Sequence, residues 1–145
     1  MACLDTSVLL DLAGRGGARG VRQAMAKLRM LVAQGEGLVT TRISVAELYV
    51  GVWRSHDPPL ERKRVEVILE GLDILDFDQR AADLFGQITA HLQQIGRPIG
   101  DLDVMIAAIS LVNGHLLVTG NASIFCKSRS SSSRPIDLWY AALDG

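Results

Sequence analysis

The feature that most constrains the fold is a short apolar run that ends in an acid. Ala2, Cys3 and Leu4 form the run, Asp5 follows it, and two hydroxyl residues lead into a second apolar run. A run this short is typical of a buried strand rather than a helix. In an open α/β sheet, ligands gather at the carboxyl ends of the strands. We therefore expect Asp5 either to cap the following turn or to belong to a functional site.

The rest of the chain alternates predicted helices with short predicted strands. Apolar periodicity and the breaks between periodic segments indicate helices over residues 18–34, 43–54, 58–70, 78–95 and 101–112, and strands over 38–41, 72–75 and 116–118. Residues 136–139 form either an edge strand or a turn before a terminal helix. This alternation predicts an α/β fold, a three-layer α/β/α sandwich with a central, mostly parallel sheet. In the first of these helices, the stripe that should face the core is Val21, Met25, Leu28 and Val32.

Length and composition favour one globular domain over residues 1–145. The chain has 48% apolar and 21% charged residues and a net charge of −1, so any attraction to a polyanion must come from local patches. Cys3 and Cys126 lack the spacing of a zinc site, and Cys3 is expected to be a buried small hydrophobe. We expect residues 126–134, a serine-rich stretch, to form a flexible loop. Because neither a signal peptide nor a membrane-spanning stretch is evident, we expect a cytoplasmic protein.

Three further acids stand where helices begin or beside apolar neighbours. Glu47 lies in the predicted helix 43–54, where Ser44 three residues earlier offers a capping box as the alternative explanation. Asp101 and Asp103 open a helix that is apolar nearly all round, and the positive end of its dipole favours acids. Asp101 is a natural N-cap. Asp103 then needs a different role.

Parallel topology would bring these acids to one edge of the sheet. Asp5 follows the first strand, Glu47 follows the second, and Asp103 opens a late helix, so all three can meet in one cleft. An oxygen-only donor set suits Mg²⁺ or Mn²⁺. A cation would also relieve the repulsion among the carboxylates, and it could activate water against a phosphodiester. The polar residues on the same edge, which could position water or a phosphate oxygen, are Thr6, Thr119 and Asn121.

A run of positive charge lies between Asp11 and Glu36. It contains no acid, and its basic residues are Arg15, Arg19, Arg22, Lys27 and Arg29. Such a run is usually a solvated face, and the alternative is a surface that faces phosphates.

Four segments together resemble the PIN domain family, and within it the VapC-type toxins of toxin–antitoxin pairs. They are LDTSVLLDL at residues 4–12, SVAELYVGV at 44–52, IGDLDVMIAAISL at 99–111 and LLVTGN at 116–121. The likeness extends over about residues 2–125, with the motifs in the family's order. It implies a Mg²⁺- or Mn²⁺-dependent endoribonuclease, with Asp5, Glu47 and Asp103 as catalytic and metal-binding residues and Asp101 as an accessory ligand.

The resemblance also implies an RNA substrate, a small cognate antitoxin and a homodimer. The antitoxin would lay a helix beside the first long helix and the region of Trp53 and Arg54. By the same resemblance, the hydroxyl and the asparagine after the late strand fall on Thr119 and Asn121.

The sequence departs from the family at Ile124. The family usually has a fourth acid there, just before a phenylalanine, and this chain has Ile124 before Phe125. The departure motivates an alternative function, a catalytically impaired PIN-like module that binds RNA or protein. A third hypothesis is a phosphoacceptor domain. Such a domain typically has a second acid two residues after the first, where this chain has Ser7, and the hypothesis does not explain why Glu47 lies in an apolar helix.

Overall fold

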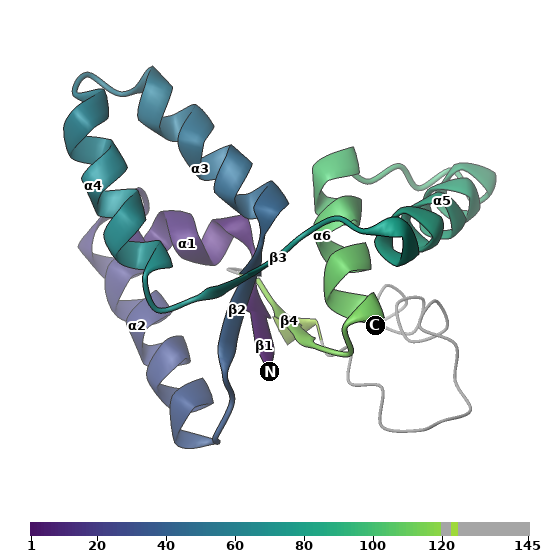
Figure 1. Ribbon diagram of the computed structural model, residues 1–145, viewed down its shortest axis with the longest axis horizontal. Helices are drawn as coiled ribbons and strands as arrows, with labels where there is room; N and C mark the ends of the chain where they lie inside the picture. The colour runs from purple at the N-terminus through teal and green to yellow at the C-terminus, as the bar shows by residue number, and fades with distance from the viewer. Residues whose placement is uncertain (120–122, 125–145) are drawn as a thin grey trace.

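The computed structural model describes residues 1–119 and the backbone of residues 123 and 124 (Figure 1). The elements in chain order are β1 (Ala2–Leu4), α1 (Thr6–Leu12), α2 (Gly17–Ala33), β2 (Leu38–Thr41), α3 (Arg42–Arg54), α4 (Pro58–Leu69), β3 (Asp73–Leu75), α5 (Gln79–Gln94), α6 (Asp101–Val112), β4 (Leu116–Val118) and β5 (Ser123–Ile124).

The sheet has the strand order β3-β2-β1-β4-β5, and its first four strands are parallel. Leu4, the last residue of β1, pairs with Thr40 of β2 and Val118 of β4, so the carboxyl ends of these strands lie at one edge. The chain continues from β1 to one side of the sheet and later returns to the other, which makes the end of β1 a topological switch point. The predicted α/β fold is confirmed.

Residues of β1 alternate between two cores, as expected for a strand with helices on both faces. Ala2 and Leu4 pack in a cluster with side chains of α1, α2, α3 and α4. Cys3 packs in a second cluster, with side chains of α5 and α6. Figure 1 shows these two groups of helices on opposite sides of the sheet. The structure thus has the three predicted layers.

Cys3 behaves as the small buried hydrophobe that was predicted. It is fully buried, and this burial is the main reason that the pKa of its thiol rises to about 12. A thiol with so high a pKa is a poor nucleophile at neutral pH. Its role is therefore in packing.

Helix α2 lies where it was predicted, and its buried face was predicted only in part. Leu28 of the expected stripe packs against the core, but Val32 is 59% exposed, whereas Gly20, Ala24 and Leu31 are buried. The small residues allow a close approach, because a Cβ at Gly20 would lie 3.3 Å from the Asp11 carboxylate of α1. Periodicity finds apolar side chains, and it overlooks a face whose contacts depend on the absence of a side chain.

Two short elements were not predicted. Helix α1 has only seven residues, too few for a clear apolar period, and its start is set by the N-cap Asp5. Strand β5 runs antiparallel to β4 over two residues. The predicted serine-rich loop 126–134 and the element at 136–139 lie outside the described residues. Within the described residues, no helix is long and apolar enough to cross a membrane.

Candidate active site

Asp5 stands at the carboxyl end of the central strand and begins α1. Its backbone N–H donates to the Val118 carbonyl at 3.0 Å, which holds Asp5 against the end of β4. Its Oδ1 accepts from the Val8 backbone N–H at 3.2 Å and from the Ser7 hydroxyl at 2.6 Å. Asp5 is therefore the N-cap of α1, as the first of the two expectations required. Capping leaves the second expectation open, because an N-cap at a sheet edge can also face a ligand.

The ionised form of Asp5 is costly in this position. Burial raises the pKa of Asp5 above its ordinary value of 3.8, hydrogen bonds from Ser7 and Val8 lower it, and the charge of Asp103 raises it. The influence of Asp103 means that α6 brings a second carboxylate toward the end of β1. A second negative charge near a half-buried carboxylate favours a nearby cation.

Glu47 is joined to this edge by a hydrogen bond from Thr6. The Thr6 hydroxyl, on the residue after Asp5, donates to Glu47 Oε1 at 2.8 Å, and Thr6 is only 8% exposed. The expectation that Thr6 positions water or phosphate is untested, but its hydroxyl proton is directed at Glu47. Thr6 thereby fixes the orientation of one candidate ligand.

The capping-box explanation of Glu47 was wrong. The N-cap of α3 is Thr41, whose hydroxyl oxygen accepts from the Ser44 backbone N–H at 3.1 Å. Ser44 therefore occupies the position that a capping-box glutamate would need, and Glu47 lies one turn further into the helix. The buried threonine at the end of β2 was a better cap because the strand passes directly into α3. Glu47 is free of that structural role.

Asp101 and Asp103 lie in the first turn of α6, and both are exposed. The prediction of Asp101 as the N-cap was wrong, because the N-cap is Gly100 and it makes no side-chain capping bond. The extended backbone of Gly100 enters the helix one residue earlier than expected, so Asp101 is already helical. The dipole of α6 stabilises both acids.

The remaining candidates surround the end of β4. The Thr119 carbonyl accepts from Lys27 Nζ at 2.9 Å, so α2 reaches across to the residue that follows β4. No local pattern distinguishes Lys27 from the other basic residues of the run, because this contact joins residues 92 positions apart. Asn121 lies outside the described residues, and Ile124 is described only as backbone in β5.

The donor set fits a divalent cation in chemistry, although the carboxylates are not gathered into a cage. Among the described residues, no three Asp, Glu, His or Cys side chains lie close enough together to hold a metal ion by themselves. In the part of the chain that the structure describes, no ion pair engages Asp5, Glu47 or Asp103, and their side chains offer carboxylate oxygens at or near this edge. Such donors suit Mg²⁺ or Mn²⁺ rather than zinc.

Known proteins with similar sequences are ribonucleases. The family model of the PIN domain matches residues 2–130. The tRNA(fMet)-specific endonuclease VapC of Shigella flexneri is 33% identical over 104 residues, which cover 72% of this chain and 78% of that protein. Ribonuclease VapC2 of Haemophilus influenzae is 38% identical over 88 residues, which cover 61% of this chain and 67% of that protein.

Solved structures share the fold. DNA-bound VapBC from Salmonella typhimurium aligns with a TM-score of 0.70 and 28% identity, covering 83% of this chain and 86% of that chain. VapBC2 from Rickettsia felis, bound to a DNA fragment from its promoter, aligns with a TM-score of 0.72 and 24% identity over 81% and 85% of the two chains. The second likeness is evidence for the fold alone.

Substitution of Asp5 should separate its capping role from the cost of its charge. In EDTA at pH 7, we expect Asp5→Asn to unfold at a higher temperature than the wild type, because an amide keeps the cap and removes the ionised group. Asp5→Ala should be about 1 kcal/mol less stable than Asp5→Asn because it loses the cap. Thermal unfolding followed by circular dichroism measures both.

The pH dependence of this difference follows from the sign of the shift. The folded-state pKa of Asp5 lies above 3.8, so the carboxylate lowers stability above that folded pKa, and the penalty vanishes below 3.8, where both states are protonated. The advantage of Asp5→Asn should shrink as the pH falls toward 4. An Asp5→Asn protein less stable than wild type at pH 7 would contradict this account.

Proposed function

This chain belongs to the PIN domain family, and on that premise we propose that it is a Mg²⁺- or Mn²⁺-dependent endoribonuclease, the toxin of a toxin–antitoxin pair. It would hydrolyse phosphodiester bonds of RNA with a metal-activated water. The observation that carries the proposal is the hydrogen bond from Thr6 to Glu47. It joins the helix that Asp5 starts to an acid 41 residues from Thr6, at the sheet edge where ligands are expected.

Different parts of the structure would hold the candidate acids in place in this mechanism. Asp5, Glu47 and Asp103 would hold the cation and serve as the catalytic residues, with Asp101 as an accessory ligand. When bound, the cation would polarise the phosphate and lower the pKa of a water molecule. Asp5 is held by β1 and its capping bonds, and Glu47 is held by Thr6. Thr119 and Asn121 would position water or a phosphate oxygen beside them.

The partners proposed here follow from the relatives and from the exposed surface. The VapBC assemblies among the solved structures support a small antitoxin as the cognate partner. Trp53 is 70% exposed on α3, with the Arg62 guanidinium 5.5 Å from its ring centroid, so a large apolar surface is open to a protein contact. A homodimer and a cytoplasmic location complete the proposal. The single-domain organisation over residues 1–145 is part of it.

The direct test is cleavage of RNA by the purified protein. With Mn²⁺, we expect the wild type to cut single-stranded RNA, EDTA to stop the reaction, and Glu47→Gln to lower the rate by at least about 100-fold, since a metal ion contributes several kcal/mol to such a reaction. Glu66→Gln, at an exposed glutamate of α4, is the matched control and should cleave as the wild type does. Cleavage that survives both EDTA and Glu47→Gln would exclude the mechanism.

Thr6 provides a test of how Glu47 is held. We expect Thr6→Val to weaken Mn²⁺ binding by about 10- to 100-fold, the usual effect of removing a hydrogen bond to a metal-binding side chain. Thr6→Ser keeps the hydroxyl and should bind Mn²⁺ nearly as the wild type does. Isothermal titration calorimetry measures the affinities, and equal affinities for Thr6→Val and wild type would contradict the assigned role.

The alternative, an impaired module that binds RNA or protein, is motivated by Ile124. It predicts salt-sensitive RNA binding that Glu47→Gln leaves unchanged, with no cleavage. If the missing acid weakens the site, Ile124→Asp should raise the rate of RNA cleavage in Mn²⁺. Ile124→Asn is the matched uncharged control. Equal rates for Ile124→Asp and Ile124→Asn would show that a carboxylate at this position is not what limits activity.

A further inference from the structure

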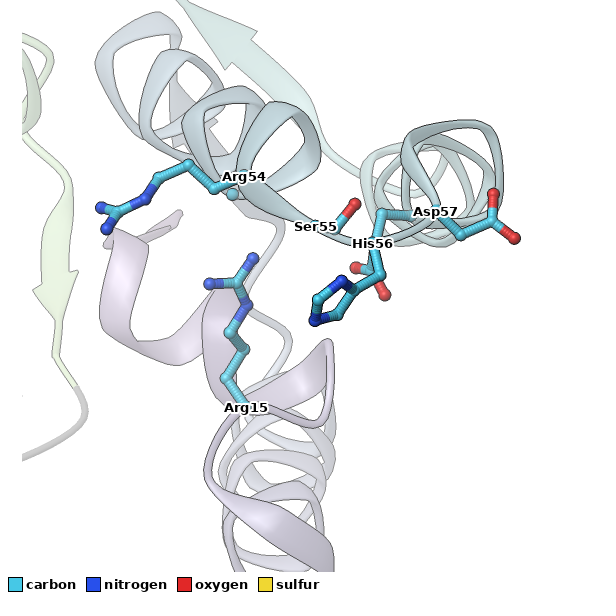
Figure 2. A pocket seen from close by; sticks show the side chains of 7 residues that line it. Arg15, Arg54, Ser55, His56 and Asp57 are labelled. Atoms are coloured by element: carbon cyan, nitrogen blue, oxygen red, sulfur yellow. The ribbon is translucent and has the colours of Figure 1, made fainter.

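A pocket with two arginines lies at the far end of α3 from its junction with β2. Its volume is about 370 Å³, and it opens between the turn that joins α1 to α2 and the end of α3 (Figure 2). In Figure 2, Arg15 rises toward α3, with Arg54 and His56 above and beside it. Besides Gly51, the lining residues are Arg15, Arg54, Ser55, His56, Asp57 and Glu61.

Gly51 makes room for Arg15. It is buried in the last turn of α3, and a Cβ at this position would collide with the Arg15 guanidinium. Glycine inside a helix costs about 1 kcal/mol relative to alanine. The helix thus has a glycine at the one point where its backbone meets this guanidinium.

The lining of the pocket contains two carboxylates, Asp57 and Glu61, besides the two arginines, and each carboxylate has a partner other than Arg15 or Arg54. No hydrogen bond or ion pair engages Arg15 or Arg54 in the part of the chain that the structure describes. Glu61 pairs with Arg64 at 2.7 Å, and Asp57 caps α4 through the Leu60 backbone N–H. Figure 2 shows the Asp57 carboxylate turned away from the two arginines. Two guanidinium groups beside an open cavity are suited to an anion, and their planar forks match phosphate oxygens.

Helix α3 connects this pocket to the candidate acids. Glu47, Gly51 and Arg54 are spaced at i, i+4 and i+7, so they follow one face of the helix. Seven residues of helix separate Glu47 from Arg54 by about 10 Å along the axis. Arg15 also begins the stretch between Asp11 and Glu36 that carries five basic residues and no acid.

We propose that the pocket formed by Arg15, Gly51 and Arg54 binds a phosphate of the RNA strand that flanks the scissile bond. This inference rests on the proposed function, which places the scissile phosphate at Asp5, Glu47 and Asp103. The competing occupant is a carboxylate of the antitoxin. The shared α3 face and the acid-free basic stretch favour RNA, because a polymer with a charge on every nucleotide can contact the acids' cation and the arginines together.

The test is binding of a fluorescent single-stranded oligoribonucleotide of about 12 nucleotides, measured by anisotropy in EDTA so that no cleavage intervenes. We expect Arg15→Gln and Arg54→Gln each to weaken binding by about fivefold to tenfold at about 50 mM salt, and each to reduce the slope of log K against log salt by about 0.7. Arg80→Gln on α5, where Arg80 pairs with Asp78, is the matched control and should bind as the wild type does.

Gly51→Ala tests the geometry without removing a charge. The added methyl group should displace the Arg15 guanidinium and weaken RNA binding as much as Arg15→Gln does. In the Arg15→Gln background, Gly51→Ala should cause no further loss. Circular dichroism establishes that each variant is folded, and Arg54→Gln provides the same test without altering the helix interior.

The outcomes separate this proposal from the proposed function. Loss of RNA binding in the arginine variants supports the phosphate site even if the wild type cleaves nothing. Wild-type RNA affinity in those variants overturns it even if cleavage is normal, and so does a wild type that binds no RNA. Unchanged RNA binding with weaker binding of the antitoxin would assign the pocket to the protein partner and overturn the proposal.

Discussion

The hydrogen bond between Thr6 and Glu47 is the interaction on which the candidate site depends. It joins the first turn of α1 to the second turn of α3, and it does so next to the end of the central strand. Without it, Glu47 would be a half-buried carboxylate on a helix with no fixed direction. With it, the acids at residues 5 and 47 are held at one rigid edge, because β1 pairs with β2 along its whole length. A buried hydroxyl that satisfies a carboxylate is stabilising in itself. Here it also determines where a ligand can bind.

The sheet edge and the pocket at the far end of α3 both contain residues that are not explained by stability alone. Burial and the charge of Asp103 raise the pKa of Asp5, so its ionised form is costly there. Asp103 lies at a helix start that already has Asp101, with no capping bond from Gly100. Gly51 occupies a helix interior where alanine would be more stable. Local rules of folding are broken most often where a protein acts, and these three positions lie on or beside the surface that we assign to RNA.

Much of the architecture could be predicted from the sequence because it depends on local patterns. The buried helix α6 and the alternation of helices and strands follow from apolar periodicity, and Asp78 was identified as the start of α5 from its neighbours. The errors arose where packing over long distances decides. The close approach of α2 to α1 turns the buried face toward Gly20, Ala24 and Leu31, and Thr41 rather than Ser44 caps α3. The candidate acids could be identified from their positions after strands or at a helix start. The pocket at Arg15 could not be predicted, because it depends on the absence of a side chain at Gly51, far away in the sequence.

Strand β1 has only three residues, and it is paired on both sides. A shift of one residue would exchange the positions of Cys3 and Leu4 between the two cores, and neither core has room for the exchange, because both side chains are fully buried. The same shift would carry Asp5 one step along the ladder and separate it from Thr6 and Ser7 as they are now placed. The packing of Ala2, Cys3 and Leu4 therefore also determines where the candidate carboxylate of Asp5 lies, so a shift of strand register would disrupt the core and the candidate site together.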